Sequence, residues 1–90
     1  MHRDESVKKD YTARGLSLAR FGRHKEAIEK FEKALKQNPQ DHNALFNISV
    51  SLEKLGRLDE AIEYLYKAIE IAPDDFLSHY HLGNLLLNTS

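Results

Sequence analysis

The sequence predicts an all-α fold in which five antiparallel helices form helical-hairpin repeats, stacked as an α–α superhelix. Two observations support this. The chain matches itself at an offset of 34 residues, so that 21–29 aligns with 55–63 and Pro39 aligns with Pro73. Apolar residues also recur at the spacing of an amphipathic helix, as in the stripe from Ala61 through Leu65. The sequence contains no strand-like alternation of apolar and polar residues.

Each repeat unit is expected to contain two helices joined by a short turn. Glycine stands in the turn within each unit, at Gly22 and Gly56, and proline ends each unit. Asp41 in the second unit and either Asp74 or Asp75 in the third are placed to cap the next helix. The expected helices span about 6–21, 24–37, 41–55, 58–71 and 75–88. They form one domain over 1–90, with repeat units at about 8–41 and 42–75 and a partial unit at 76–90.

Composition excludes several classes of protein. The chain has 90 residues, a net charge of −1 and no cysteine, which argues against a dedicated nucleic-acid binder, a disulfide scaffold and a thiol enzyme. No apolar run approaches the length of a membrane span, so no membrane partner is expected. The polar first residues lack a hydrophobic leader, and a cytoplasmic location is the expectation.

One face of the expected helix 41–55 is apolar without belonging to its core stripe. Advancing 100° per residue places Phe46, Asn47 and Val50 in a sector opposite Leu45 and Leu52. Equivalent positions 34 residues away extend this sector over the first and fifth helices. The resulting candidate peptide-binding groove consists of Thr12, Leu16, Arg20, Asn43, Phe46, Asn47, Val50, Lys54, Leu77, Tyr80, His81 and Asn84. Aromatic anchors mixed with amides suit peptide recognition. The alternative is that Phe46 and Val50 fill the space between successive helical pairs.

The repeat resembles the tetratricopeptide repeat (TPR) family. The first unit has Tyr11-x2-Arg14-Gly15-x2-Leu18, Ala27-x3-Phe31 and Pro39; the second has Leu45-x2-Ile48-Ser49-x2-Leu52, Ala61-x3-Leu65 and Pro73; the third has His79-x2-Leu82-Gly83-x2-Leu86. The resemblance implies a right-handed superhelix whose concave face, lined by the first helix of each unit, binds a peptide or another protein. It does not imply the carboxylate clamp of one TPR subclass, because the matching positions are Thr12, Leu16, Asn47, Leu77 and His81, of which Asn47 alone fits.

Catalytic, metal and cofactor sites are not expected. No phosphate-binding loop, nucleophile elbow or metalloprotease motif occurs, so the chain is expected not to be an enzyme. His79 and His81 are two residues apart and point in different directions on a helix, with His79 at a core-side repeat position and His81 on the groove. Lysines of the second helix alternate with glutamates, which favours a solvated face over an RNA site.

The last helix is expected to be an open end. Leu82 and Leu86, with Gly83, are expected to pack onto the 58–71 helix, whereas Leu85 is expected to face an absent neighbour. Phe76, Leu85 and Leu87 are therefore the candidate self-association residues, in a homodimer or an end-to-end stack. Two functions follow: a non-catalytic module that binds a peptide or partner helix, or a structural repeat module that stacks on further repeats or on itself. The alternative for this end is a capping helix with a few harmless exposed leucines.

Overall fold

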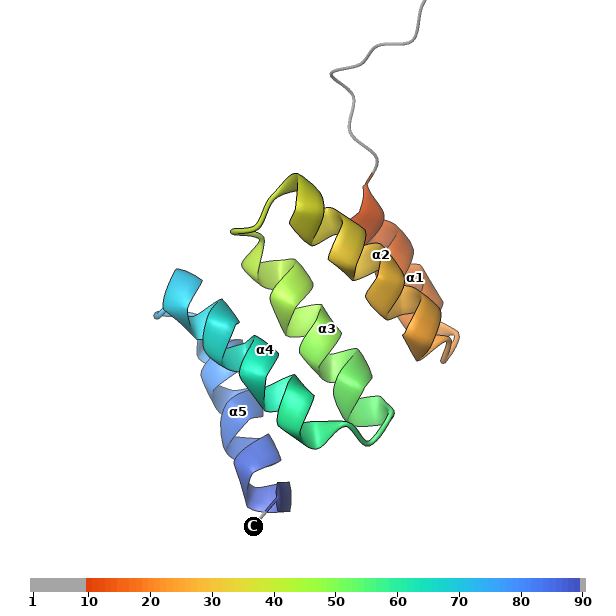
Figure 1. Ribbon diagram of the computed structural model, residues 1–90. Helices are drawn as coiled ribbons and strands as arrows, with labels where there is room; N and C mark the ends of the chain where they lie inside the picture. The colour runs from red at the N-terminus through yellow and green to blue at the C-terminus, as the bar shows by residue number, and fades with distance from the viewer. Residues whose placement is uncertain (1–9, 90) are drawn as a thin grey trace, which may run out of the picture.

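The computed structural model describes residues 10–89, which form five helices and contain no strand (Figure 1). The helices are α1 Tyr11–Arg20, α2 His24–Gln37, α3 His42–Lys54, α4 Leu58–Ile71 and α5 Phe76–Thr89. They account for 81% of these residues. The predicted all-α fold is confirmed, and the predicted bounds of α2 to α5 agree to within one residue at each end. The first helix begins at Tyr11 rather than at 6, and predicted positions 6–9 lie outside the described residues.

Aspartates begin three of the helices. The backbone N–H of Ala13 donates to Asp10 Oδ1 at 3.0 Å, and that of Ala44 donates to Asp41 Oδ1 at 3.1 Å. At α5 the capping residue is Asp75, whose Oδ2 accepts from Ser78 Oγ at 2.7 Å. These bonds satisfy N–H and O–H groups of the first turn that have no partner within the helix. In the second and third units, the start of the first helix is thereby set by an aspartate two residues after the proline of the preceding loop.

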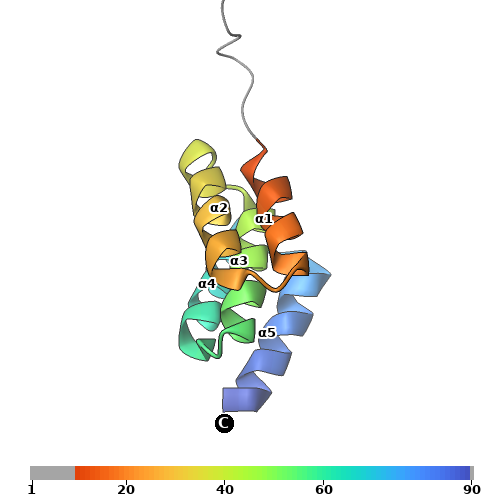
Figure 2. The ribbon, with the colours of Figure 1, turned by 90° about the vertical axis from the view of Figure 1, so that its right-hand side faces the viewer.

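α3 lies in the middle of the stack, with one pair of helices on each side of it. α2 and α4 lie on one side of α3, and α1 and α5 lie on the other (Figure 2). Each helix packs on its neighbour in the chain, and α1 also contacts α3. The core runs through the stack as a single cluster: Ala27, Phe31, Ile48, Leu52, Ala61, Leu65 and Leu85. Because the contacts are between neighbours, the stack has the quasi-one-dimensional organisation of a solenoid.

A small residue at one repeat position sets how closely the two helices of a unit approach. In the first unit this residue is Gly15, and a Cβ there would lie 2.7 Å from Cδ1 of Phe31. In the second unit the same position is Ser49, which is fully buried. In α5 it is Gly83, and a Cβ there would meet nothing within 4 Å. The same register position is therefore covered in two units and open in the third.

The expected orientation of α5 is wrong in part. Leu85 is fully buried and joins the core, whereas Leu86 is 44% exposed. Leu85 follows Ser51 by one repeat, and Ser51 faces back to α2 through His24. Leu85 correspondingly belongs to the interface with the preceding helix α4, so it cannot be an exposed self-association residue. Leu82 packs against the core as expected.

Candidate functional site

The predicted groove residues lie on the first helix of each unit, namely α1, α3 and α5. Figure 2 places α1 and α5 on the same side of α3, so α3 is set back between them. We call this face the inner surface: Thr12, Leu16, Arg20, Asn43, Phe46, Asn47, Val50, Lys54, Leu77, Tyr80, His81 and Asn84. None of these residues is fully buried. Their side chains are therefore at least partly accessible, as a contact surface requires.

The centre of the inner surface is partly used for packing. Phe46, Asn47 and Val50 of α3 are half-buried. The Phe46 ring lies 5.5 Å from the His81 ring of α5, centroid to centroid, with the planes tilted by 57°. Phe46 also packs against the core cluster. Phe46 is thus partly used to fill the space between successive helical pairs, and it is not fully buried.

A close polar contact joins α3 to α5 beside this ring contact: it is an ion pair when His81 is protonated, and the buried His81 Nε2 makes no hydrogen bond. Glu53 Oε1 lies 3.2 Å from His81 Nε2, and the two side chains are 29% and 16% exposed. His81 is accordingly engaged with Glu53 and Phe46. Sequence reasoning missed Glu53, although the same helical arithmetic identifies it, since Glu53 follows Phe46 by seven residues and two turns bring it to the same side.

The α1 side of the inner surface mixes structural and exposed groups. The hydroxyl of Thr12 donates to Asp41 Oδ2 at 3.3 Å, which ties α1 to the start of α3. Leu16 is 37% exposed. Arg20 and Lys54 are both exposed in the last turns of α1 and α3. They occupy one repeat position, so one end of the inner surface is basic.

The α5 side presents the most accessible apolar groups. Leu77 is 59% exposed and Tyr80 is 62% exposed, and Asn84 is exposed beside them. The rings of Tyr80 and Phe76 stack with centroids 6.0 Å apart and planes 19° from parallel. Phe76, a predicted self-association residue, thus lies with its ring against that of a predicted groove residue.

Histidines and acidic residues do not gather into a metal site. Within residues 10–89 no group of three or more His, Cys, Asp or Glu side chains is close enough to hold an ion. His79 is exposed and hydrogen-bonds the Pro73 carbonyl oxygen at 2.7 Å through Nε2. Its expected core-side placement is wrong, because no described helix covers α5 as α4 covers α3. His2 lies outside the described residues.

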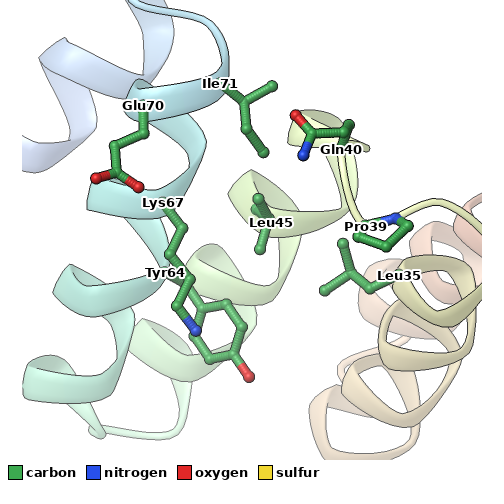
Figure 3. A pocket seen from close by; sticks show the side chains of 8 residues that line it. All are labelled: Leu35, Pro39, Gln40, Leu45, Tyr64, Lys67, Glu70 and Ile71. Atoms are coloured by element: carbon green, nitrogen blue, oxygen red, sulfur yellow. The ribbon is translucent and has the colours of Figure 1, made fainter.

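A cavity of about 380 Å³ opens on the α2 and α4 side of the stack (Figure 3). It is lined by Leu35, Pro39, Gln40, Leu45, Tyr64, Lys67, Glu70 and Ile71. Lys67 Nζ lies 4.9 Å from the centroid of the Tyr64 ring. Burial raises the pKa of the Tyr64 phenol, and the carboxylates of Glu32 and Glu60 raise it further. Sequence reasoning did not find this cavity, because it forms where the loop between units meets two non-adjacent helices.

The fold defines the protein as a helical-hairpin solenoid, and comparison with known families identifies which one. The tetratricopeptide repeat family model matches residues 12–76, and the chain belongs to this family. No curated protein matches the sequence. None of the helices in the described part of the chain is long and apolar enough to cross a membrane.

Solved structures of the protein MamA are similar in fold. One, a MamA RS-1 ArsTM double mutant, has a TM-score of 0.83 and 21% sequence identity over 92% of this chain. Another MamA mutant has a TM-score of 0.79 and 26% identity over 88% of this chain. The present chain spans 49% and 58% of the lengths of those two chains. These likenesses describe a shared arrangement of helices.

Proposed function

We propose that the chain is a protein–protein interaction module that binds a peptide or partner helix on its inner surface. Membership of the TPR family supports a role in protein interaction in general. The observation that carries the specific proposal is the exposure of Leu77 and Tyr80 next to the amide of Asn84. Exposed apolar groups interleaved with hydrogen-bonding amides are typical of contact surfaces for polypeptides.

The charges on the inner surface predict the orientation in which a ligand would bind. Arg20 and Lys54 make one end of the inner surface basic, whereas the α5 side carries Leu77 and Tyr80. The ligand that complements this pattern carries an acidic side chain or carboxylate near Arg20 and Lys54. Its apolar side chains contact α3 and α5. His81 is half-buried between the Phe46 ring and the Glu53 carboxylate.

The test is selection of binders from a displayed library of random 12-residue peptides, followed by affinity measurements on variants. Substituting Asn47→Ala and Tyr80→Ala together is expected to abolish binding of the selected peptides and to leave the thermal midpoint nearly unchanged. Tyr66→Ala is the matched control, since Tyr66 is 51% exposed on α4, away from the inner surface. Unfolding of the double variant would show that the pair is core and would refute the proposal, as would equal loss of binding in the control.

A second candidate function, self-association as a structural module, is favoured by α5. Five of its large apolar side chains are well exposed: Phe76, Leu77, Tyr80, Leu86 and Leu87. The buried position of Leu85 removes that residue from the proposed contact, which leaves Phe76 and Leu87 of the original three. Clustered exposed apolar residues on one helix are typical of a surface that another polypeptide covers.

A further inference from the structure

We propose that Glu53 binds an arginine of the ligand, so that the inner surface selects peptides that carry an arginine close to an acidic residue. The inference rests on the proposed peptide-binding function and names the chemistry of its ligand. Glu53 follows Phe46 by seven residues and lies on the same side of α3. Three features support the proposal: the charge of Glu53, its lack of an arginine or lysine partner, and the aromatic rings beside it.

The charge of Glu53 is unusual on this face. The sequences of the three helices that carry the inner surface, α1, α3 and α5, contain one acidic residue, which is Glu53. Arg20 and Lys54 of the same surface are cations. In α2 and α4 glutamates are frequent, and Glu26 and Glu60 each pair with an arginine three residues earlier. A ligand on the inner surface therefore meets a carboxylate at Glu53 among otherwise basic and neutral helices.

The Glu53 carboxylate forms no ion pair with a lysine or arginine within residues 10–89. The basic nitrogen that does approach it is His81 Nε2, 3.2 Å from Oε1, and this nitrogen makes no hydrogen bond. The Glu53 side chain is 29% exposed, so it is partly removed from water and still accessible. A partly desolvated carboxylate attracts a cation more strongly than an exposed one does, because the local dielectric constant is lower.

The surroundings of Glu53 favour arginine over lysine. The rings of Phe46 and His81 lie 5.5 Å apart, centroid to centroid, and His81 also contacts the carboxylate. A guanidinium donates two parallel hydrogen bonds to a carboxylate, stacks on aromatic rings and is weakly hydrated. An ammonium is strongly hydrated and loses more on entering a half-buried site. Arginine is therefore the side chain that this site is expected to accept.

Lys54 places the acidic residue of the ligand. Glu53 and Lys54 are consecutive, and an α-helix turns 100° between neighbours. Because Glu53 contacts His81 of α5, this turn directs the exposed Lys54 away from that contact. A ligand that lies across α3 thus meets a cation and an anion in succession. Its acidic residue and its arginine are expected within about four residues of each other, since an extended chain advances about 3.3 Å per residue.

Selection on variants of the chain tests the site. Displayed random 12-residue peptides are selected on the unsubstituted chain, on Glu53→Gln and on Glu63→Gln. The last is the matched control, because it makes the same change at an exposed glutamate of α4. Peptides selected on the unsubstituted chain and on the control are expected to be enriched in arginine, and those selected on Glu53→Gln are not. Thermal unfolding checks that both variants remain folded.

Affinities of a selected peptide measure the pairing directly. Replacing its arginine by glutamine is expected to weaken binding to the unsubstituted chain by at least about tenfold, and replacement by lysine by a smaller factor. Against Glu53→Gln the same replacements are expected to change the affinity by less than about twofold, because the partner of the arginine is gone. Glu53→Lys is expected to reverse the preference, so that a peptide with glutamate in place of the arginine binds this variant more tightly.

The outcomes separate this inference from the proposed function. Selected peptides without enrichment in arginine, or with an arginine equally important for binding to Glu53→Gln, refute the Glu53 site and leave peptide binding by the inner surface intact. Failure to select any peptide refutes the proposed function and this inference with it. Unfolding of both Glu53→Gln and Glu53→Lys shows that the carboxylate serves the contact between α3 and α5, and it refutes the proposal as well.

Discussion

The ring of Phe31 fills the space where a side chain on Gly15 would begin, whereas the equivalent space beside Gly83 is empty. Both glycines lie inside helices and occupy the same position of the repeat. Their different surroundings give the same substitution opposite expected effects at the two sites.

Gly15→Ala is expected to destabilise the protein and Gly83→Ala to stabilise it. The added methyl at Gly15 collides with the Phe31 ring, and overpacking of this kind costs about 1–3 kcal/mol, partly offset by the better helix propensity of alanine. At Gly83 the propensity gain of about 0.5–1 kcal/mol is expected without a collision. Chemical denaturation at a concentration where the protein is monomeric measures both. A stabilised Gly15→Ala variant would contradict the packing of Phe31.

The two buried serines of α3 are expected to differ in the same way. Ser49 Oγ is buried and has no hydrogen-bond partner, whereas Ser51 Oγ lies 3.3 Å from His24 Nδ1. Ser49→Ala is therefore expected to raise the free energy of unfolding by about 1 kcal/mol, since it removes an unsatisfied buried hydroxyl. Ser51→Ala is expected to lower it by about 1 kcal/mol, since it removes the partner of His24. Equal changes in denaturation midpoint for the two variants would argue against this assignment.

Ala61 is expected to reject a larger side chain. It is fully buried in the core cluster between α3 and α4. Ala61→Leu is expected to cost about 1–3 kcal/mol, because the close-packed neighbours must move to admit the added atoms. Ala13→Leu is the control, since Ala13 is exposed on α1. Thermal unfolding is the measurement, and a loss of similar size in both variants would contradict a special constraint at Ala61.

The carboxyl of Glu60 is expected to titrate below its ordinary pKa of 4.5. Its pKa is lowered mainly by the hydrogen bond from Arg57, whose Nε lies 2.7 Å from Oε1. A lowered pKa in the folded state means that the stabilisation is present above the unfolded value and is lost as pH falls through the folded value. NMR titration of the Glu60 carboxyl carbon measures the midpoint.

Arg57→Ala is expected to move the Glu60 midpoint upward. Arg23→Ala is the control, because Arg23 makes the equivalent bond to Glu26 one repeat earlier. It is expected to leave the Glu60 midpoint in place. A Glu60 midpoint that does not respond to loss of Arg57 would show that the hydrogen bond is not maintained in solution.

The repeat register made the fold predictable and the faces of its last helix less so. Alignment at 34 residues located the helices, because proline, glycine and the small core positions recur at fixed offsets. The same register places Leu85 with Ser51, and so at the interface with the preceding helix. Because Leu85 lies off the stripe of Leu82 and Leu86, it was predicted instead to face an absent neighbour. This repeat position is buried in both α3 and α5. In α3 it carries the polar residue Ser51, so the sequence pattern did not show that it belongs to the core.

The site was predictable as a face and not as a set of contacts. Helical rotation grouped the predicted inner-surface residues onto helices that the structure has as α1, α3 and α5. It did not find the pairing of Glu53 with His81, which depends on how one unit is rotated against the next. The cavity beside Tyr64 was missed for the same reason, since its walls come from helices two apart in the chain.

Asp41 and Asp75 begin corresponding helices but divide their oxygens differently. Asp41 Oδ1 accepts from the backbone N–H of Ala44 in its own helix, and Oδ2 accepts from the hydroxyl of Thr12 in the preceding unit. Both carboxylate oxygens of Asp75 accept hydrogen bonds from the first turn of its own helix, Oδ1 from the backbone N–H of Leu77 and Oδ2 from the hydroxyl of Ser78. The carboxylate of Asp41 therefore links the first two units. α5 is held to the preceding unit by the contact between Glu53 and His81 and by side-chain packing. Native-state hydrogen exchange is therefore expected to give α5 a lower free energy of opening than the rest of the stack. The amides of α1 to α4 are expected to open together as one cooperative unit.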